Sequence, residues 1–304
     1  MKITLNLGAH YSGTEALTLA CTENPQIFGH EKVSIWGRQD PRVAMLMKLA
    51  RDPGSIAGAD QALSQRALNL LKIHVEDEVK AGADRIIIDA VNLLGTRQDN
   101  LRMRKLYRKA TERLDRVLPA FADHDLQLCL IPRAYDAYWS ITLFEAVSHG
   151  VAQPDDAVLD YLVTQPTRWR HLVEALIDTA PKARMDIISF EAFGNRPQDA
   201  LGCLFNAAGR PVELNSYSAE LAEKMRVDPV WNTFEAHQLD ALRAQYREDV
   251  EWFEAQNRPM LNYHRPQRTE QKLTTVTGNQ TVIRPRRVTL ERGNDDEYQK
   301  RAMG

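Results

Sequence analysis

Residues 5–17 constrain the fold more than any other stretch of this chain. A short apolar strand pattern at 5–7 is followed by a loop bounded by Gly8 and Gly13, and Thr14 then opens a helical pattern. A loop of this kind points backbone N–H groups and a helix N-terminus at one small volume, which suits an anion such as phosphate. The stretch therefore predicts a strand–loop–helix unit with an anion site.

The spacing of the two glycines matches the GxxxxG element of a P-loop, but the next residues differ. In P-loop nucleotide-binding proteins, a lysine and then Ser or Thr follow the second glycine. Here Thr14 and Glu15 occupy those two positions. The loop is therefore interpreted as a phosphate site without the usual lysine, which disfavours ordinary ATP chemistry.

Short apolar runs alternate with long helical patterns through most of the chain. The predicted strands are 3–7, 32–36, 85–89, 126–131 and 185–190. The predicted helices are 62–81, 100–121, 135–149, 198–206, 219–225 and 234–256. Nearly continuous apolar runs, as in 86–88, are typical of central parallel strands covered on both faces. The predicted fold is an α/β three-layer sandwich of P-loop type, with a central parallel sheet and helices on both faces.

The composition divides the chain into two parts. Residues 1–256 carry the alternating pattern and are predicted to form the α/β domain, with no strong strand after residue 191. Residues 257–304 are polar and basic and form a C-terminal arm. Within the arm, 274–276 and 281–283 are compatible with a small hairpin, and an extended or partly disordered arm is equally compatible.

Charge and cysteine content exclude several classes of function. The formal net charge is -2 and the pI about 6.5, so no global basic field attracts nucleic acid. No apolar run is long enough to span a bilayer, and Asn6, His10 and Glu15 interrupt the region that a signal peptide would need. The three cysteines show no CxxC spacing and the eight histidines no metal-ligand spacing. A cytoplasmic protein without a metal site is expected.

A second motif stands at the end of the fourth predicted strand. Residues 130–132 lead into Arg133, and Ser140 follows on the next predicted helix. Arginine offers a bidentate fork to a phosphate, and a hydroxyl near a helix N-terminal turn adds another donor.

Together, the two motifs resemble those of the sulfotransferase superfamily, in particular its bacterial members. The first loop resembles their 5′-phosphosulfate loop, and Arg133 with Ser140 resembles their 3′-phosphate site. Further stretches similar to the bacterial branch extend the resemblance over residues 1–256 in order; they are 35–38, 92–96, 190–194 and 246–252. The C-terminal arm is not covered.

The resemblance implies a co-substrate and a set of ligands. It implies binding of 3′-phosphoadenosine-5′-phosphosulfate (PAPS) or of its product, 3′-phosphoadenosine 5′-phosphate (PAP), and sulfuryl transfer to a hydroxyl acceptor such as a sugar or glycolipid. The residues implied for nucleotide binding are Gly8, Ser12, Gly13 and Thr14 around the 5′-phosphosulfate, and Arg133 and Ser140 around the 3′-phosphate.

The chain departs from the family pattern at two positions that take part in catalysis in the family. Tyr11 stands where the family has its loop lysine, and Val91 where many relatives have a glutamate that acts as general base. His10, Tyr11 and Asp89 are the candidate catalytic residues that remain. Two alternatives stay open: a catalytically inactive protein of the same fold with a binding or scaffold role, and, less favoured, a P-loop kinase.

Overall fold

A six-stranded sheet of parallel strands forms the centre of the structure. The computed structural model describes residues 1–51, 59–193, 196–205, 212–216, 218, 220–221 and 233–264. All of them belong to one compact unit, Met1–Pro266. The strands are β1 Lys2–Asn6, β2 Val33–Trp36, β3 Arg85–Asp89, β4 Asp125–Leu130, β5 Arg184–Ile188 and β6 Leu261–His264, in the order β2-β3-β1-β4-β5-β6.

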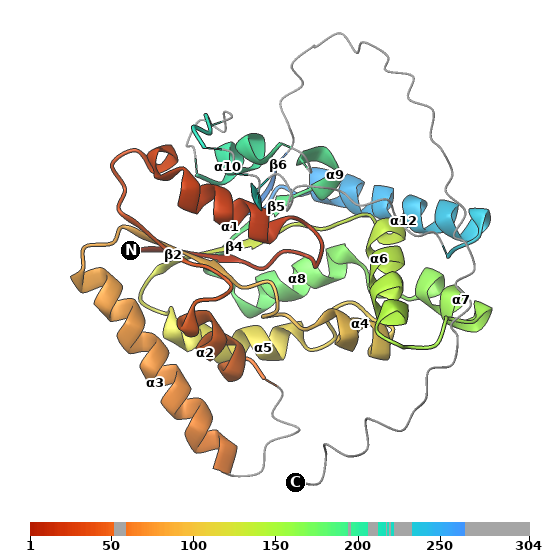
Figure 1. Ribbon diagram of the computed structural model, residues 1–304, viewed down its shortest axis with the longest axis horizontal. Coiled ribbons are helices and arrows are strands. Elements are labelled where there is room, and N and C mark those ends of the chain that lie inside the picture. The colour runs from red at the N-terminus through yellow and green to blue at the C-terminus, as the bar shows by residue number, and fades with distance from the viewer. Residues whose placement is uncertain are drawn as a thin grey trace, which may run out of the picture. The chain divides into compact units, whose positions relative to one another are not determined.

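Helices connect the strands and cover both faces of the sheet (Figure 1). They are α1 Thr14–Glu23, α2 Pro41–Leu49, α3 Ala59–Lys80, α4 Arg97–Met103, α5 Ala110–Val117, α6 Tyr135–Ser148, α7 Asp156–Thr164, α8 Trp169–Thr179, α9 Phe190–Phe193, α10 Pro197–Phe205 and α12 Ala236–Ala255, with 3-10 turns η1 Pro25–Phe28 and η3 Leu118–Ala120.

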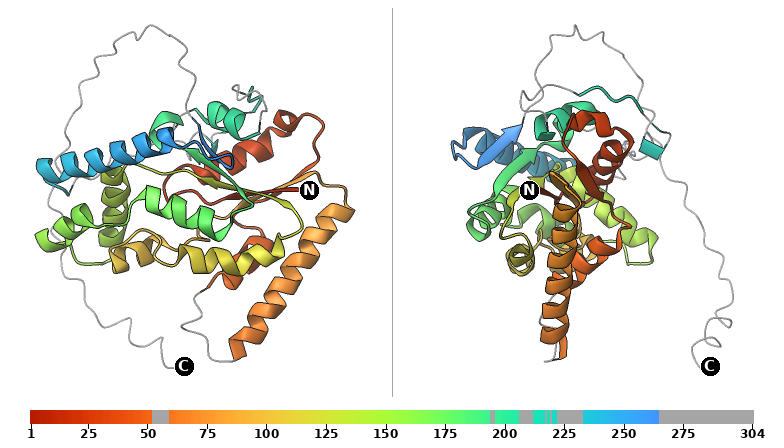
Figure 2. Two further views of the ribbon diagram at one scale, coloured as in Figure 1. Left: turned by 180° about the vertical axis from the view of Figure 1, so that it is seen from behind. Right: turned by 90° about the vertical axis from the view of Figure 1, so that its left-hand side faces the viewer.

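The two faces of the sheet have separate hydrophobic cores, because successive strand residues point to opposite sides. In β3, Ile86 and Ile88 join the core under α5, α6, α8 and α12, whereas Ile87 joins the smaller core under α1 and α10. Figure 1 and the views in Figure 2 show these helices on the two sides of the sheet. The chain is thus an α/β three-layer sandwich, as predicted.

The sixth strand was not predicted: the expectation of no strand after residue 191 is wrong. Strand β6 lies beyond residue 256 and pairs with β5. The residues of β6 are mostly polar, and two of them bond to a buried carboxylate of β5. Asp186 accepts from Asn262 Nδ2 at 3.3 Å and lies 2.6 Å from His264 Nε2. Asp186 also accepts from Gln127 Nε2 at 2.9 Å, which extends this polar row to β4.

The single helix predicted at 100–121 is also wrong, because the structure has two helices there. Helix α4 ends at Met103, and α5 begins at Ala110. Arg104 and Tyr107, between them, have φ values of 48° and 41°, which a continuous right-handed helix does not allow. The break turns Tyr107 into the protein interior, where it is 3% exposed.

Most other predicted elements are confirmed. The five predicted strands correspond to β1–β5, and the helices at 62–81, 135–149, 198–206 and 234–256 correspond to α3, α6, α10 and α12. Most of the helix predicted at 219–225, and the hairpin at 274–283, lie outside the described residues. In the described part of the chain, no helix combines the length and apolar character needed to cross a bilayer.

Two arginines at the start of α8 pair with carboxylates of α12. Arg168 pairs with Glu248, and Arg170 Nε lies 3.8 Å from Asp249 Oδ1. Asp249 is fully buried and also lies within 3.2 Å of the Trp169 backbone N–H. These contacts attach α8 to α12.

Candidate functional site

The carboxyl ends of β1, β3 and β4 bring three loops together. Because the strands are parallel, the loops that follow them meet at one edge of the sheet. The Ala9 backbone N–H donates to the Ile131 carbonyl at 3.0 Å, and the Ala90 N–H to the Asn6 carbonyl at 3.0 Å. The loop between β1 and α1, residues 7–13, therefore lies against the segments that carry Asp89 and Arg133.

The loop is held in shape by its own residues. Gly8 and Gly13 have φ values of 48° and 73°, a region that favours glycine. The Ser12 hydroxyl donates to the Ala9 carbonyl at 2.6 Å and accepts from the Ala9 N–H at 3.0 Å. Ser12 therefore closes the loop with its side chain, so that only its backbone is left to contact a ligand.

The N-terminus of α1 has no side-chain cap. Gly13 occupies the N-cap position and offers no acceptor to the first backbone N–H groups of the helix. Thr14 is buried, and its methyl group packs against Gly8. Glu15 points outward, 44% exposed, with its Oε2 3.6 Å from Arg38 Nη1. The Glu15 carboxylate is thus directed toward an arginine and not into the loop, where it would repel a phosphate.

Arg133, which the resemblance assigned to the 3′-phosphate, reaches across to the loop. Its guanidinium donates to the Tyr11 carbonyl and lies 4.6 Å from the centre of the Phe190 ring. Its own carbonyl accepts from Trp169 Nε1 at 2.8 Å. Only 4% of Arg133 is exposed, so this cation is largely desolvated beside the loop.

His10 belongs to a buried hydrogen-bond network. Its Nε2 lies 2.9 Å from Asn92 Oδ1 and its Nδ1 2.8 Å from the Tyr107 hydroxyl. The amide oxygen of Asn92 accepts only, so the proton is on Nε2, and Nδ1 accepts from Tyr107. The His10 backbone N–H donates to the same hydroxyl at 3.2 Å. Both ring nitrogens are therefore engaged within the protein, which suits a residue that fixes the loop.

The network makes stability depend on pH in a predictable direction. Burial, with smaller effects of Arg97 and Arg38, lowers the pKa of His10 from 6.5 to about 4. Between these two values the unfolded chain takes up a proton that the folded protein does not. The free energy of unfolding should therefore fall as pH drops below 6.5, by about 2 kcal/mol between pH 7 and pH 5 from this residue. Urea unfolding at both pH values measures the change.

The control for this pH dependence is His10→Gln, which removes the titrating group. The variant should be less stable at pH 7 but should lose about 2 kcal/mol less than the natural chain on going to pH 5. Equal pH dependence of the two proteins would show that His10 is open to solvent.

Tyr11 and Asp89 are the other two candidate catalytic residues. Tyr11 has a φ of 62°, and the Arg97 guanidinium lies 5.6 Å from its ring centre. Burial and the Glu145 carboxylate raise the pKa of Tyr11, so its hydroxyl stays protonated. Asp89 is 2% exposed, and its Oδ1 accepts from the Val91 N–H at 3.4 Å, the turn-capping role that such a carboxylate often has.

Ser140 is the residue that the resemblance placed with Arg133 at the 3′-phosphate. It is fully buried in α6, and its hydroxyl has no hydrogen-bond partner in the described part of the chain. The cavity beside the loop measures about 20 Å³, with Ser12 and Gly13 on one side and Phe190 and Phe193 on the other. This is room for about one water. A nucleotide could bind here only if Arg133, Phe190 or Phe193 moved.

Sequence reasoning missed several residues that build this edge. Tyr107 and Arg97 contact the loop or its neighbours from stretches without a recognisable motif. Arg38, which faces Glu15, lies in 35–38, a stretch that carried the resemblance but gave it no role. Phe190 lies in a stretch that carried the resemblance, although no role was assigned to it. The available signal was an aromatic residue two positions after the last residue of a buried strand.

Comparison with known proteins adds one similarity. No protein-family model matches the sequence, and no curated protein matches it. Among solved structures, the chain is similar to a sulfotransferase from Alicyclobacillus acidocaldarius, with 14% identity and a TM-score of 0.39, over 79% of this chain and 94% of that chain. A likeness at this level carries no argument about function. The α/β assignment rests on the parallel sheet, and any activity on the residues of the loop.

Proposed function

We propose that this chain is a sulfotransferase-like protein that binds PAPS or PAP at the loop between β1 and α1. One observation carries the proposal: the uncapped N-terminus of α1 and the desolvated guanidinium of Arg133 converge on the same glycine-bounded loop. Backbone N–H groups at a helix N-terminus favour an anion, and an arginine adds charge and a bidentate fork.

The roles of the residues follow from their contacts. Backbone N–H groups of the 12–14 segment would hold the 5′-phosphosulfate, and Arg133 would exchange its bond to the Tyr11 carbonyl for one to the nucleotide. Ser140 would become a ligand only after a movement that exposes it. Sulfuryl transfer to a hydroxyl acceptor would be an in-line displacement in which positioning and charge supply the rate.

A second candidate is nucleotide binding without transfer. The observation that favours it is the engagement of His10 on both ring nitrogens, with its pKa at about 4. A general base needs a free acceptor within reach of the proton it takes, and a pKa near the working pH. For transfer, Asp89 would be the remaining candidate proton acceptor, and it is only 2% exposed.

Thermal unfolding with PAP tests binding, which both candidates require. At a PAP concentration about a hundred times the dissociation constant, the folded state should gain about 2.7 kcal/mol, or roughly 5 to 10 °C in melting temperature. Arg133→Ala should abolish the shift and Arg133→Lys should keep part of it. Arg184→Ala is the matched control, because Arg184 begins β5 at the opposite edge of the sheet.

The outcomes separate the proposal from its rivals. A shift that persists in Arg133→Ala, or no shift at millimolar PAP, would overturn the nucleotide site. A shift with Mg-ATP and none with PAP would instead favour a kinase. Given a PAP shift, release of PAP from PAPS in the presence of hydroxyl acceptors separates transfer from binding alone.

A further inference from the structure

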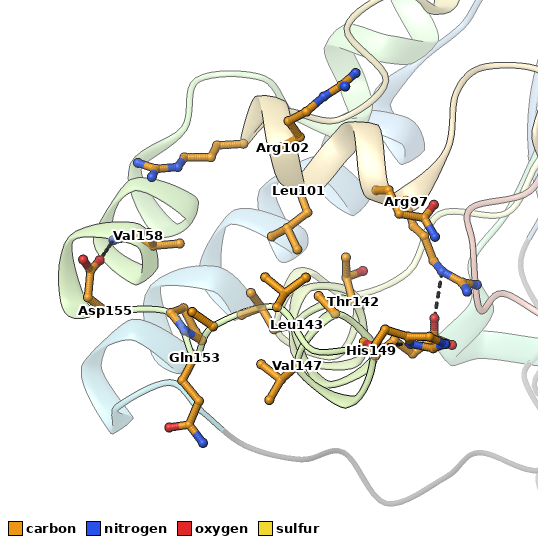
Figure 3. Close-up of a pocket in the computed structure, with 17 residues that line it drawn as sticks. Arg97, Leu101, Arg102, Thr142, Leu143, Val147, His149, Gln153, Asp155 and Val158 are labelled. Carbon is orange, nitrogen blue, oxygen red and sulfur yellow. Dashed lines mark hydrogen bonds and ion pairs between the residues drawn. The ribbon is translucent and has the colours of Figure 1, made fainter. Parts of the chain in front are cut away.

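A second pocket lies between α4, α6 and the connection from α6 to α7, apart from the nucleotide loop. Its volume is about 490 Å³, within the range of small-molecule sites. Figure 3 shows Leu101 of α4 facing Thr142, Leu143 and Val147 of α6, with Arg97 at one end of the pocket.

The body of the pocket is aliphatic. The apolar residues of its lining are Leu101, Leu143, Ala146, Val147, Val151, Ala152, Pro154 and Val158. One of them, Val151, is 54% exposed, so apolar surface continues to the mouth. The hydroxyl of Thr142 is already used, because it donates to the Tyr138 carbonyl at 2.7 Å. The middle of the pocket thus favours a hydrocarbon chain over a sugar or a base.

Charge distinguishes the two ends of the pocket. At the Arg97 end, Nε of that arginine pairs with Glu145 Oε2 at 2.7 Å. Asp155, the other carboxylate of the lining, accepts from the Val158 N–H at 2.9 Å as the N-cap of α7. Both acidic groups are therefore engaged by the protein.

Arg104 provides the charge at the other end. It follows α4 directly, and its guanidinium lies 5.6 Å from the centre of the Tyr161 ring. Within the described residues, no carboxylate pairs with it. It lies seven positions after Arg97, which at 1.5 Å per helical residue is roughly 10 Å along the helix axis. A cation that no described carboxylate pairs with thus lines an aliphatic pocket.

We propose that this pocket binds an aliphatic monoanion, such as a medium-chain carboxylate, with its chain between α4 and α6 and its headgroup at Arg104. The hydrocarbon chain of the ligand would cover apolar surface on both helices. Its anionic headgroup would give Arg104 an oppositely charged partner. This site does not depend on the nucleotide loop. The Arg97 end of the pocket nevertheless adjoins the nucleotide loop, because the Arg97 guanidinium lies over the ring of Tyr11.

Equilibrium dialysis of the full chain with radiolabelled decanoate and with decanol tests the proposal. Decanoate should bind saturably, with one equivalent per chain. Ala146→Phe, which fills the pocket, should weaken binding of both probes at least tenfold. The matched control is Ala157→Phe, which adds the same ring on an exposed position of α7 outside the lining and should change neither affinity.

The headgroup is tested separately. Arg104→Ala should weaken decanoate binding about fivefold and leave decanol unchanged, because a partly exposed charge pair contributes modestly. Arg104→Lys should restore most of the loss. Circular dichroism and thermal unfolding confirm that each variant is folded.

Three results would overturn the proposal. They are the absence of saturable decanoate binding, equal effects of Ala146→Phe and Ala157→Phe, and equal weakening of both probes by Arg104→Ala. Self-association that Ala146→Phe abolishes, without decanoate binding, would assign the pocket to a second copy of the chain. None of these results bears on PAP binding, so the two proposals fail independently.

Discussion

Replacing Gly8 with alanine is expected to lower the free energy of unfolding by about 2 to 5 kcal/mol and to abolish stabilisation by PAP. A Cβ at this position would lie 2.1 Å from Thr14 Cγ2, far inside contact distance. The left-handed conformation, with φ at +48°, adds a penalty of roughly 1–2 kcal/mol for a residue with a side chain. Overpacking typically adds about 1–3 kcal/mol. Urea unfolding, with and without PAP, measures both effects.

Two further variants separate strain from collision. Gly150 also has a positive φ, at +88°, but a Cβ there meets no atom within 4 Å, so Gly150→Ala should cost only the conformational penalty. Thr14→Ser removes the colliding methyl group, so the double variant Gly8→Ala/Thr14→Ser should recover most of the difference between the two alanine variants. If Gly8→Ala lowers the free energy of unfolding no more than Gly150→Ala does, the Thr14 methyl group does not restrict the space at Gly8.

The strands and most helices could be predicted because their signal is local. An apolar run such as 86–88 indicates a covered parallel strand wherever it stands in the chain. Strand β6 lacks such a run, since its polar residues are held by Asp186, more than seventy positions away. The break in 100–121 is equally hidden, because the Tyr107 N–H bonds to the side chain of Asn100 while the apolar spacing continues.

For the candidate site, the sequence pointed to individual residues but not to the contacts between them. The glycine spacing predicted the loop, and the strand end drew attention to Arg133 as a 3′-phosphate ligand. The bond from Arg133 to the Tyr11 carbonyl, which joins the two motifs, was not predicted. The state of His10 was not predictable, because its partners Asn92 and Tyr107 are 82 and 97 residues away. Only the fold decides whether a loop histidine faces a substrate or the interior.

Removing the Trp169 side chain is expected to have the other large effect. Trp169 is fully buried, stacked on Tyr135 at 5.9 Å between ring centres, with the Tyr138 ring edge-on at 5.6 Å. Trp169→Ala should lower the free energy of unfolding by about 3–5 kcal/mol. Circular dichroism in urea follows the change without relying on tryptophan fluorescence. Trp252→Ala is the matched control; Trp252 is only partly buried and should cost less.

Trp169 also contacts the backbone of Arg133, the arginine beside the nucleotide loop. A milder variant tests whether this contact affects PAP binding. Its indole N–H donates to the Arg133 carbonyl at 2.8 Å. Trp169→Phe keeps an aromatic ring but leaves that buried carbonyl without its donor, at a cost of about 1–3 kcal/mol. If the carbonyl bond positions the guanidinium, Trp169→Phe should reduce the PAP-induced shift, whereas Trp252→Phe should not. An unchanged shift in Trp169→Phe would mean that the Phe190 ring and the Tyr11 carbonyl suffice to position Arg133.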